Sequence, residues 1–329
     1  MLFSVIALPK KVTMASEELD PTFRRALNLL HSTSVDSAQQ LKLMLDEAIK
    51  TRREQGAQSE DQVVAPRSLT EGYKLGSVLG EGAFGTVYSG QRVRDNLPVA
   101  IKLIPDIDNV TMDVDEEYGR VPLEVKLLRQ ASGVPGVINF LEHFQSPQGL
   151  SIVFEKLENA TDLFYFISDS GKLPEYVARK VFCQVLISVK GCHDRGILHR
   201  DIKIENILVD TLTLSAKLID FGCATYLHKG PYYAYEGTLT SAPPEWFWHR
   251  NYTAENLSVW SLGIVLYAMV IGDRPFKRVS EIKRAHLHIE VDLTVECEDI
   301  IRRCLEPKPK RRVTINELCR HPWLGEDIS

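Results

Sequence analysis

A glycine-rich turn between two β-rich stretches constrains the fold of this 329-residue chain more than any other feature of its sequence. The stretch "GEGAFGTV" (80–87) has the form G-x-G-x-x-G-x-V, whose glycines let the backbone approach phosphate groups closely. A dinucleotide-binding turn carries the same glycines, but it leads into a helix. Here "TVYSGQRV" continues as a strand and "PVAIKLI" follows as another. The pattern predicts a hairpin over nucleotide phosphates, with Lys102 on the next strand.

Charge and cysteine usage narrow the class of protein. The net charge is 39 − 44 = −5, whereas nucleic-acid-binding proteins more often present a basic face, so we expect no nucleic-acid partner. The cysteines include no C-x-x-C pair, which predicts reduced thiols in the cytoplasm or the nucleus. They are Cys183, Cys192, Cys223, Cys297, Cys304 and Cys319.

Two apolar stretches were weighed as targeting or membrane segments. The start, "MLFSVIALPKK", lacks a positively charged beginning and is broken by Ser4 and Pro9, so we do not expect a signal peptide. The longest apolar run, 259–272, is shorter than the roughly 20 residues that cross a bilayer. It predicts a buried core helix, and we expect no membrane partner.

The sequence predicts three regions. Residues 1–70 form an extension in which two segments repeat apolar residues at i, i+3, i+4 and i+7, typical of amphipathic helices, before a polar linker. These helices either pack on the main domain, which we favour, or dock a partner. Residues 71–157 are β-rich and residues 158–325 follow a helical period, which predicts an α+β protein with two lobes.

The stretch "LHRDIKIENIL" (198–208) carries the chemistry. Phosphoryl transfer requires metal ions on the phosphates, a group that orients the acceptor hydroxyl, and positive charge where negative charge develops. Asp201 is the candidate acceptor of the hydroxyl proton, and Lys203 is the candidate for stabilising the transferred phosphate. Asn206, together with Asp220 of "KLIDFG", is a candidate Mg²⁺ ligand.

Two ion pairs complete the predicted site. Lys102 needs an acidic partner, and Glu124 in "RVPLEVKLLRQ" is the candidate, although a helix glutamate can also be merely exposed. Glu116 and Glu117 compete for that role, but they fall in "DIDNVTMDVDEEYG", which predicts a solvated acidic loop. Downstream, Glu245 in "APPEW" is expected to pair with Arg312.

Six such elements in one order make coincidence negligible, and residues 71–325 resemble the eukaryotic protein kinases. Within them the chain resembles the Pim family of serine/threonine kinases. The stretches that carry this resemblance are "VYSGQRVRDNLPVAIK", "RVPLEVKLL", "DLFYFI", "ILHRDIKIENILVD", "KLIDFG", "GTLTSAPPEW" and "VWSLGIVLYAMVIGDRPF".

The resemblance implies a protein serine/threonine kinase (EC 2.7.11.1) of bilobal fold, with ATP and Mg²⁺ as cofactors. It implies catalytic roles for Asp201, Lys203, Lys102 and Glu124, and metal binding by Asn206 and Asp220. The implied nucleotide-binding residues are Leu79, Gly80, Gly82, Phe84, Gly85, Val87, Ala100, Lys102, Glu155 and Leu157. Pim kinases have proline where this chain has Leu157, so an N–H that can bind adenine is expected to be restored.

The resemblance also implies a monomer that acts on basic protein substrates. Acidic residues of the family are matched at Asp162, Glu205 and Asp273. Other positions where Pim kinases carry Asp are occupied here by Tyr165, Ile204 and Ala268. We therefore expect a basic preference that is weaker or narrower than the family's.

Control by phosphorylation is expected to be absent, as in the Pim family. Arg200 usually pairs with a phosphate of the loop that follows Asp220, and Glu236 is the expected substitute here. Cys223 is expected to be a small buried residue; the alternative is a reactive thiol. Ser258 stands where most kinases have Asp. Pim kinases lack that Asp as well, so its absence does not count against activity.

Two other classes of protein were considered. A pseudokinase scaffold would have lost Lys102, Asp201, Asn206 or Asp220, and all four are present. A metabolic phosphotransferase would not need the "APPEW" stretch, which in protein kinases belongs to the peptide platform. An active protein kinase is therefore the favoured prediction, with the scaffold as its alternative.

Overall fold

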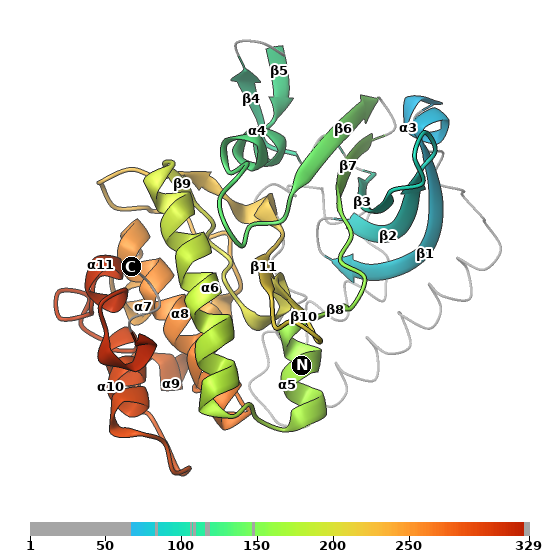
Figure 1. Ribbon diagram of the computed structural model, residues 1–329. Coiled ribbons are helices and arrows are strands. Elements are labelled where there is room, and N and C mark those ends of the chain that lie inside the picture. Colours follow the sequence, from blue (N-terminus) through green and yellow to red (C-terminus); the bar gives the residue numbers. More distant parts are fainter. Residues whose placement is uncertain are drawn as a thin grey trace, which may run out of the picture. The chain divides into compact units, whose positions relative to one another are not determined.

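The computed structural model describes residues 67–82, 85–105, 107, 110–115, 119–146 and 149–325 of the chain (Figure 1). Residues 65–329 form a single unit. The two amphipathic helices expected in the extension, and any partner that they dock, lie outside the described residues.

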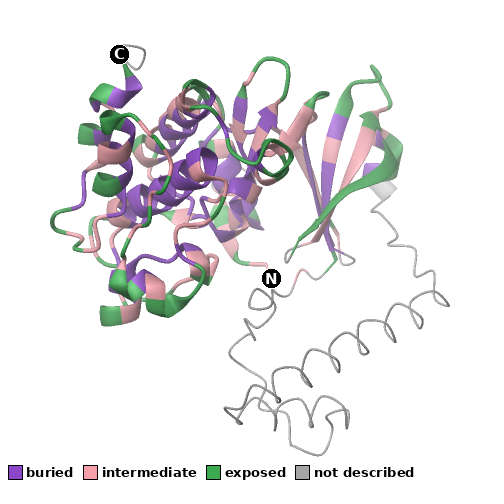
Figure 2. Ribbon diagram, turned by 90° about the horizontal axis from the view of Figure 1, so that it is seen from below, coloured by how far each residue is buried: buried purple, intermediate pink, exposed green. Residues whose placement is uncertain are grey.

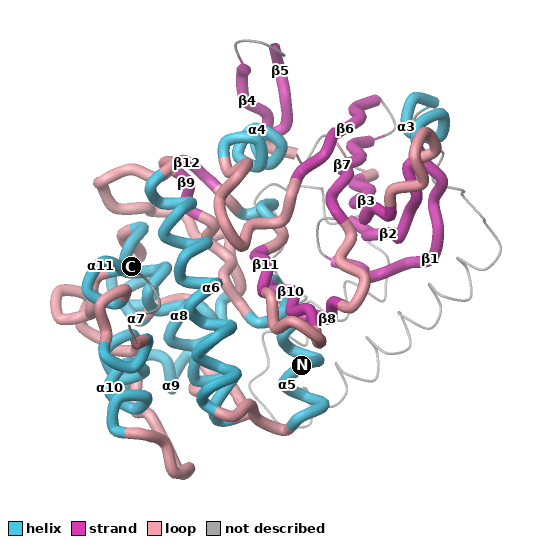
Figure 3. Tube along the Cα trace, viewed as in Figure 1, coloured by secondary structure: helices cyan, strands magenta, loops and turns pink. Residues whose placement is uncertain are grey.

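An antiparallel sheet of five strands forms the first lobe, in the order β1-β2-β3-β7-β6. Its strands are β1 (Tyr73–Gly82), β2 (Gly85–Arg92), β3 (Pro98–Ile104), β6 (Phe140–Ser146) and β7 (Gly149–Glu155). The short helix α3 (Arg67–Gly72) precedes β1. Strands dominate this lobe and helices the other, so the α+β prediction is confirmed (Figure 3).

Alternation along β3 determines where Lys102 lies. Successive side chains of a strand point to opposite faces of the sheet. Val99, Ile101 and Leu103 pack in one apolar cluster, whereas Ile104 belongs to another cluster that includes residues of the helix after the sheet. Lys102 therefore shares the face of Ile104, and its side chain is buried there.

A hairpin leads into that helix. Strands β4 (Met112–Asp115) and β5 (Gly119–Pro122) pair antiparallel, and α4 (Leu123–Gln130) begins directly after β5. Leu123 N donates to Thr111 O at 2.8 Å, which fixes the start of the helix to the residue just before β4. The prediction of a solvated acidic loop was wrong for the described part of this stretch, because backbone pairing organises it into strands. Glu116 and Glu117 lie outside the described residues.

The second lobe is built around two long helices. Its helices are α5 (Leu163–Ser170), α6 (Glu175–Asp194), α7 (Pro244–His249), α8 (Ala254–Ile271), α9 (Val279–Arg284), α10 (Val295–Cys304) and α11 (Ile315–Leu318). Four-residue spacing in α6 buries Val177, Val181, Val185 and Val189. Helix α8 is largely apolar, and 83% of it is buried inside the protein. The prediction of a buried core helix is confirmed, and buried residues run through the helices of this lobe (Figure 2).

Short strands position the segments between the lobes. Strands β8 (Ala160–Asp162), β10 (Ile207–Asp210) and β11 (Ala216–Leu218) form a sheet in the order β11-β10-β8. Strand β9 (Ile197–Leu198) pairs with β12 (Thr225–Tyr226). The stretches 199–206 and 219–224 lie between these strands, so both are held at each end by backbone hydrogen bonds.

Candidate active site

The glycine-rich turn joins strand to strand, as predicted. Gly82 at the end of β1 pairs with Gly85 at the start of β2. A Cβ on Gly85 would lie 2.1 Å from Leu103 O, and its φ of +141° excludes side chains as well, so only glycine fits there. Phe84 lies outside the described residues. The other predicted nucleotide-binding residues of the sheet lie on β1, β2 and β3: Leu79, Gly80, Val87 and Ala100.

Lys102 lies between two carboxylates. Its Nζ is 2.8 Å from Oε1 of Glu124 on α4 and 2.8 Å from Oδ1 of Asp220. Burial alone would lower the pKa of Lys102, but the charges of Glu124 and Asp220 outweigh burial and raise it. The lysine is therefore positively charged, and the structure forms the predicted Lys102–Glu124 pair.

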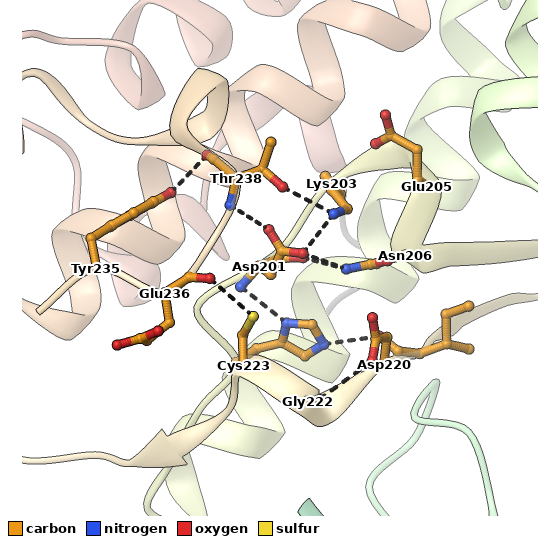
Figure 4. Close-up of polar contacts among 12 residues, drawn as sticks. Asp201, Lys203, Glu205, Asn206, Asp220, Gly222, Cys223, Tyr235, Glu236 and Thr238 are labelled. Atoms are coloured by element: carbon orange, nitrogen blue, oxygen red, sulfur yellow. Dashed lines mark hydrogen bonds and ion pairs between the residues drawn. The ribbon is translucent and has the colours of Figure 1, made fainter. Parts of the chain in front are cut away.

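Asp201 is held by donors on three sides (Figure 4). Its Oδ2 lies 2.7 Å from Lys203 Nζ and 3.0 Å from Asn206 Nδ2. Its Oδ1 accepts a hydrogen bond from the backbone N–H of Thr238 at 2.9 Å. An ionised carboxylate has about four lone-pair sites, so these three donors leave one for the hydroxyl of a substrate.

The residues predicted to bind Mg²⁺ suit that ion. Asp220 has a positive φ of 62° and caps the 3₁₀ turn of Phe221–Cys223, while Lys102 holds its pKa low despite burial. Asn206 uses its amide nitrogen on Asp201, so its amide oxygen remains for a cation. A carboxylate and an amide oxygen, with phosphates supplying further oxygens, are ligands typical of Mg²⁺.

The end of β7 leads to the predicted adenine-binding residues. Glu155 Oε1 forms an ion pair with Lys217 Nζ at 2.9 Å and accepts from the Asn139 N–H at 2.9 Å. Two residues on, the N–H of Leu157 forms no hydrogen bond with another described residue. That N–H is therefore available to a ligand, and the expected hydrogen bond to adenine stays a prediction.

The three acidic residues predicted to bind substrate already have partners within the chain. Asp162 caps α5 by accepting from Tyr165 N at 2.9 Å. Glu205 forms an ion pair with Arg274, and Asp273 forms one with Lys277 at 2.5 Å. Burial, and then the charge of Glu205, raise the pKa of Asp162. The sequence analysis missed Arg274, although its place after Asp273 was visible.

Residues 220–245, the activation segment, pack through aromatic side chains. Tyr232 stacks on His228 at 3.9 Å and on Tyr252 at 5.4 Å between ring centroids. Tyr235 stacks on Trp246 at 5.6 Å, and Tyr252 OH donates to a backbone carbonyl of the segment, Ala234 O, at 2.9 Å. These contacts fix the segment against α7 and against Tyr252, which lies between α7 and α8.

The expected pairing of Arg200 with Glu236 was wrong. Arg200 Nε instead donates to the carbonyl oxygen of Cys223, and the Glu236 carboxylate points away from the catalytic residues (Figure 4). Arg200 has a positive φ of 65°, an uncommon backbone conformation for a residue other than glycine. Cys223 is buried, and burial raises the pKa of its thiol to about 12, so it is the inert residue that we favoured.

Thr238 has a role that the sequence analysis missed. Besides its N–H on Asp201, its Oγ1 accepts a hydrogen bond from Lys203 Nζ at 3.0 Å, and Tyr235 OH donates to its carbonyl at 3.0 Å. Its position in "GTLTSAPPEW" was the available signal.

The predicted pair of Glu245 and Arg312 is confirmed. Two parallel hydrogen bonds of 2.8 and 2.9 Å join the guanidinium to the carboxylate, and both side chains are almost fully buried. A bidentate pair of this kind fixes geometry as well as charge. It anchors the start of α7, which follows the activation segment.

Residues 73–324 match the protein kinase domain, and the chain belongs to this family. It is a serine/threonine kinase that uses ATP and Mg²⁺.

Similar proteins define the group within the family. The chain is 42% identical over 263 residues to the serine/threonine-protein kinase pim-2 of Danio rerio, covering 77% of this chain and 85% of that protein. It is 40% identical over 258 residues to the serine/threonine-protein kinase prk-2 of Caenorhabditis elegans, covering 77% and 58% respectively. A PAS domain-containing serine/threonine-protein kinase of Mus musculus is 34% identical over 261 residues, covering 78% of this chain and 19% of that protein. The chain is therefore Pim-like, as the sequence motifs predicted.

Proposed function

We propose that this kinase transfers the γ-phosphoryl group of ATP to Ser or Thr in basic protein substrates, without needing phosphorylation of its activation segment. One observation carries the proposal: the segment places the Thr238 N–H on Asp201, and the contacts that hold it there come from the chain's own residues. The carboxylate that takes the hydroxyl proton is thus oriented by the segment itself.

The roles of the residues follow from their contacts. Asp201 accepts the proton of the substrate hydroxyl through the lone-pair site that its three donors leave. Lys203, bonded to both Asp201 and Thr238, places positive charge beside the transferred group. Lys102 orients the nucleotide phosphates, and Glu124 holds Lys102. Mg²⁺, when held by Asp220 and Asn206, neutralises charge on those phosphates.

Packing supports independence from phosphorylation. A phosphate usually orders an activation segment by pairing with arginine. Here stacked and edge-on aromatic pairs of Tyr232 and Tyr235 do this, each typically worth about 0.5–1.5 kcal/mol beyond burial. Arg200 is already engaged with the Cys223 carbonyl. Ordering of the segment therefore does not depend on an added charge.

The acidic side chains support basic substrates. The charge of Glu205 acts on Asp162, and Glu205 pairs with Arg274, which directly follows Asp273 in the chain. The ion pair with Arg274 reduces the negative charge of Glu205, which supports a preference weaker than a fully acidic surface would give.

The oligomeric state, the cellular compartment and the partners of the enzyme are also proposals. We propose a monomer of the cytoplasm or the nucleus that acts without nucleic acid or a membrane. The six cysteines are free thiols in the structure, which supports a reducing compartment.

The experiment measures phosphate transfer from ATP–Mg²⁺ to an Arg-rich Ser peptide, with protein that phosphatase has stripped of phosphate. Wild type should turn over, and Asp201→Asn should lose at least about a hundredfold in kcat. Asp194→Asn is the matched control, because Asp194 is an exposed aspartate paired with Lys190 on α6. A tenfold or greater loss of wild-type rate on dephosphorylation would contradict independence from phosphorylation.

The second candidate is a pseudokinase-type scaffold. Wild-type protein that does not transfer phosphate, phosphorylated or not, yet is stabilised by ATP would favour it. The three donors that orient the Asp201 carboxylate argue for the active enzyme, because a protein that only binds ATP has no need of a carboxylate positioned for a substrate hydroxyl.

A further inference from the structure

Three elements that surround the catalytic residues meet at one polar contact. Asp113 of β4, Lys126 of α4 and Tyr226 of β12 together form what we call the hairpin junction. Their side chains are 30%, 27% and 38% exposed, so the junction lies at the surface. The roles proposed above for the catalytic residues use none of these three.

One carboxylate oxygen links the three elements. Lys126 Nζ lies 3.0 Å from Asp113 Oδ2, and Tyr226 OH donates a hydrogen bond to the same oxygen. Lys126 Nζ also donates to Val114 O at 2.6 Å and lies 5.7 Å from the centroid of the Tyr226 ring. The lysine thus contacts both strand and tyrosine at once, in an arrangement that combines charge, hydrogen bonds and a cation–π contact.

The junction is charged at neutral pH. The hydrogen bond from Tyr226, and then that from Lys126, lower the pKa of Asp113 to about 2. Burial, and then Asp113, raise the pKa of Tyr226, so its hydroxyl keeps the proton that it donates. Both groups are therefore in the protonation states that the contact requires.

Two of the three residues of the junction lead to a catalytic residue. Tyr226 pairs with Ile197 of β9, and this strand runs directly into the stretch that ends at Asp201. On α4, Lys126 follows Glu124 by two residues, and positions two apart do not face each other on a helix. Glu124 can therefore reach Lys102 while Lys126 reaches the hairpin.

We propose that the hairpin junction holds α4 in the position in which Glu124 pairs with Lys102, so that Asp113, Lys126 and Tyr226 are positioning residues for phosphoryl transfer. Protein kinases need that lysine–glutamate pair in place, and the position of this helix is a common point of control. The inference rests on the proposed activity without phosphorylation: the junction links α4 to the activation segment by contacts that the chain makes itself.

The test uses small changes to the contact. Tyr226→Phe removes only the hydroxyl, Asp113→Asn removes the charge, and the double variant removes both. Lys126→Met is compared with Lys126→Arg, which keeps the charge. Tyr233→Phe is the matched control, because Tyr233 is a 73% exposed tyrosine of the same segment. Each phosphatase-treated variant is measured for kcat, peptide KM and thermal unfolding.

A positioning role predicts a split between the kinetic constants. Tyr226→Phe and Asp113→Asn should each lower kcat about three- to tenfold while peptide KM and Tm stay close to wild type. The double variant should lose no more than the worse single variant, since both remove one contact. Lys126→Arg should retain most of the rate that Lys126→Met loses.

Two results would overturn the inference. One is kcat values for Tyr226→Phe and Asp113→Asn within about twofold of the Tyr233→Phe control. The other is a loss of rate that parallels a lower Tm and disappears on cooling, as a merely structural role would give. If dephosphorylated wild type is itself inactive, the proposed independence from phosphorylation fails. The same variants, compared in phosphorylated protein, then still test whether the junction positions α4.

Discussion

At the scale of single residues, Arg274 changes what the acidic side chains near Lys203 can bind. It pairs with Oε1 of Glu205, and both side chains are more than a third exposed. Oε2 of the same glutamate is buried and forms no hydrogen bond with another described residue. A basic side chain of a substrate must therefore compete with Arg274 for this carboxylate.

Arg274→Ala should raise kcat/KM for an Arg-rich Ser peptide by about two- to fivefold, the range of an exposed ion pair. The gain should shrink with added salt. Peptide kinetics at low and high salt, with an Arg-to-Ala peptide beside the parent, measure it. Arg302→Ala is the control, since Arg302 forms an exposed pair with Glu298 on α10. An equal gain for both peptides would contradict competition at Glu205.

At the scale of elements, the turn between β1 and β2 depends on one glycine. Gly85 approaches the carbonyl of Leu103 too closely for any Cβ, and Leu103 follows Lys102 on β3. A side chain at this position would push β2 away from β3 beside the lysine that holds the phosphates.

Gly85→Ala should therefore raise KM for ATP at least about fivefold, because a strained backbone position costs on the order of 1–3 kcal/mol. ATP titrations of rate, and of thermal stabilisation by ATP, measure this. Gly72→Ala is the matched control, since a Cβ on Gly72 meets nothing within 4 Å. An unchanged KM in Gly85→Ala would show that the turn adapts.

Another contact between elements should make stability depend on pH. His193 of α6 lies 2.9 Å from the Ser258 hydroxyl of α8. Burial lowers the pKa of His193 to about 4 from its ordinary value of 6.5. The unfolded chain therefore binds a proton here at a pH where the folded protein does not.

This histidine should contribute stability that is complete above pH 6.5 and is lost as the pH falls through about 4. The shift corresponds to at most about 3 kcal/mol in the free energy of unfolding. Urea unfolding between pH 4 and 7 measures it, and His193→Gln should flatten the curve. His286→Gln, at an exposed histidine, should not. Parallel curves for wild type and His193→Gln would refute this account.

At the scale of the whole molecule, Glu245 and Arg312 join segments 67 residues apart in the sequence. The guanidinium also donates to Asn256 O at 2.9 Å and lies 4.9 Å from the ring centroid of Trp260. The pair thus connects α7, α8 and the last part of the helical lobe, and it leaves no polar group of its own unpaired.

Arg312→Met should lower the free energy of unfolding by about 3–5 kcal/mol, because Glu245 is left as an uncompensated buried charge. Denaturant unfolding measures the loss. Arg303→Met, which breaks an exposed pair with Asp299, should cost less than about 1 kcal/mol. Adding Glu245→Gln to Arg312→Met should recover part of the loss; a further loss would contradict the charge argument.

Much of the site could be predicted because protein kinases carry the motifs that contain its residues in a fixed order along the chain. The pairs Lys102–Glu124 and Glu245–Arg312 were named from motifs alone, and both form in the structure. The helical and strand periods likewise predicted two lobes and a buried α8. Local sequence is enough to predict helices and strands because the spacing of their apolar residues follows from the backbone geometry of each element.

The sequence by itself determined the class of enzyme, the lobes and the residue types that the chemistry requires. Only the tertiary structure decided how side chains from distant segments pair. In the folded protein Arg200 donates to the Cys223 carbonyl and Glu205 forms an ion pair with Arg274. Tyr226 donates a hydrogen bond to Asp113, 113 residues away in the sequence. Such contacts depend on which elements pack together, and no local spacing specifies that when several charged partners compete within a few ångströms.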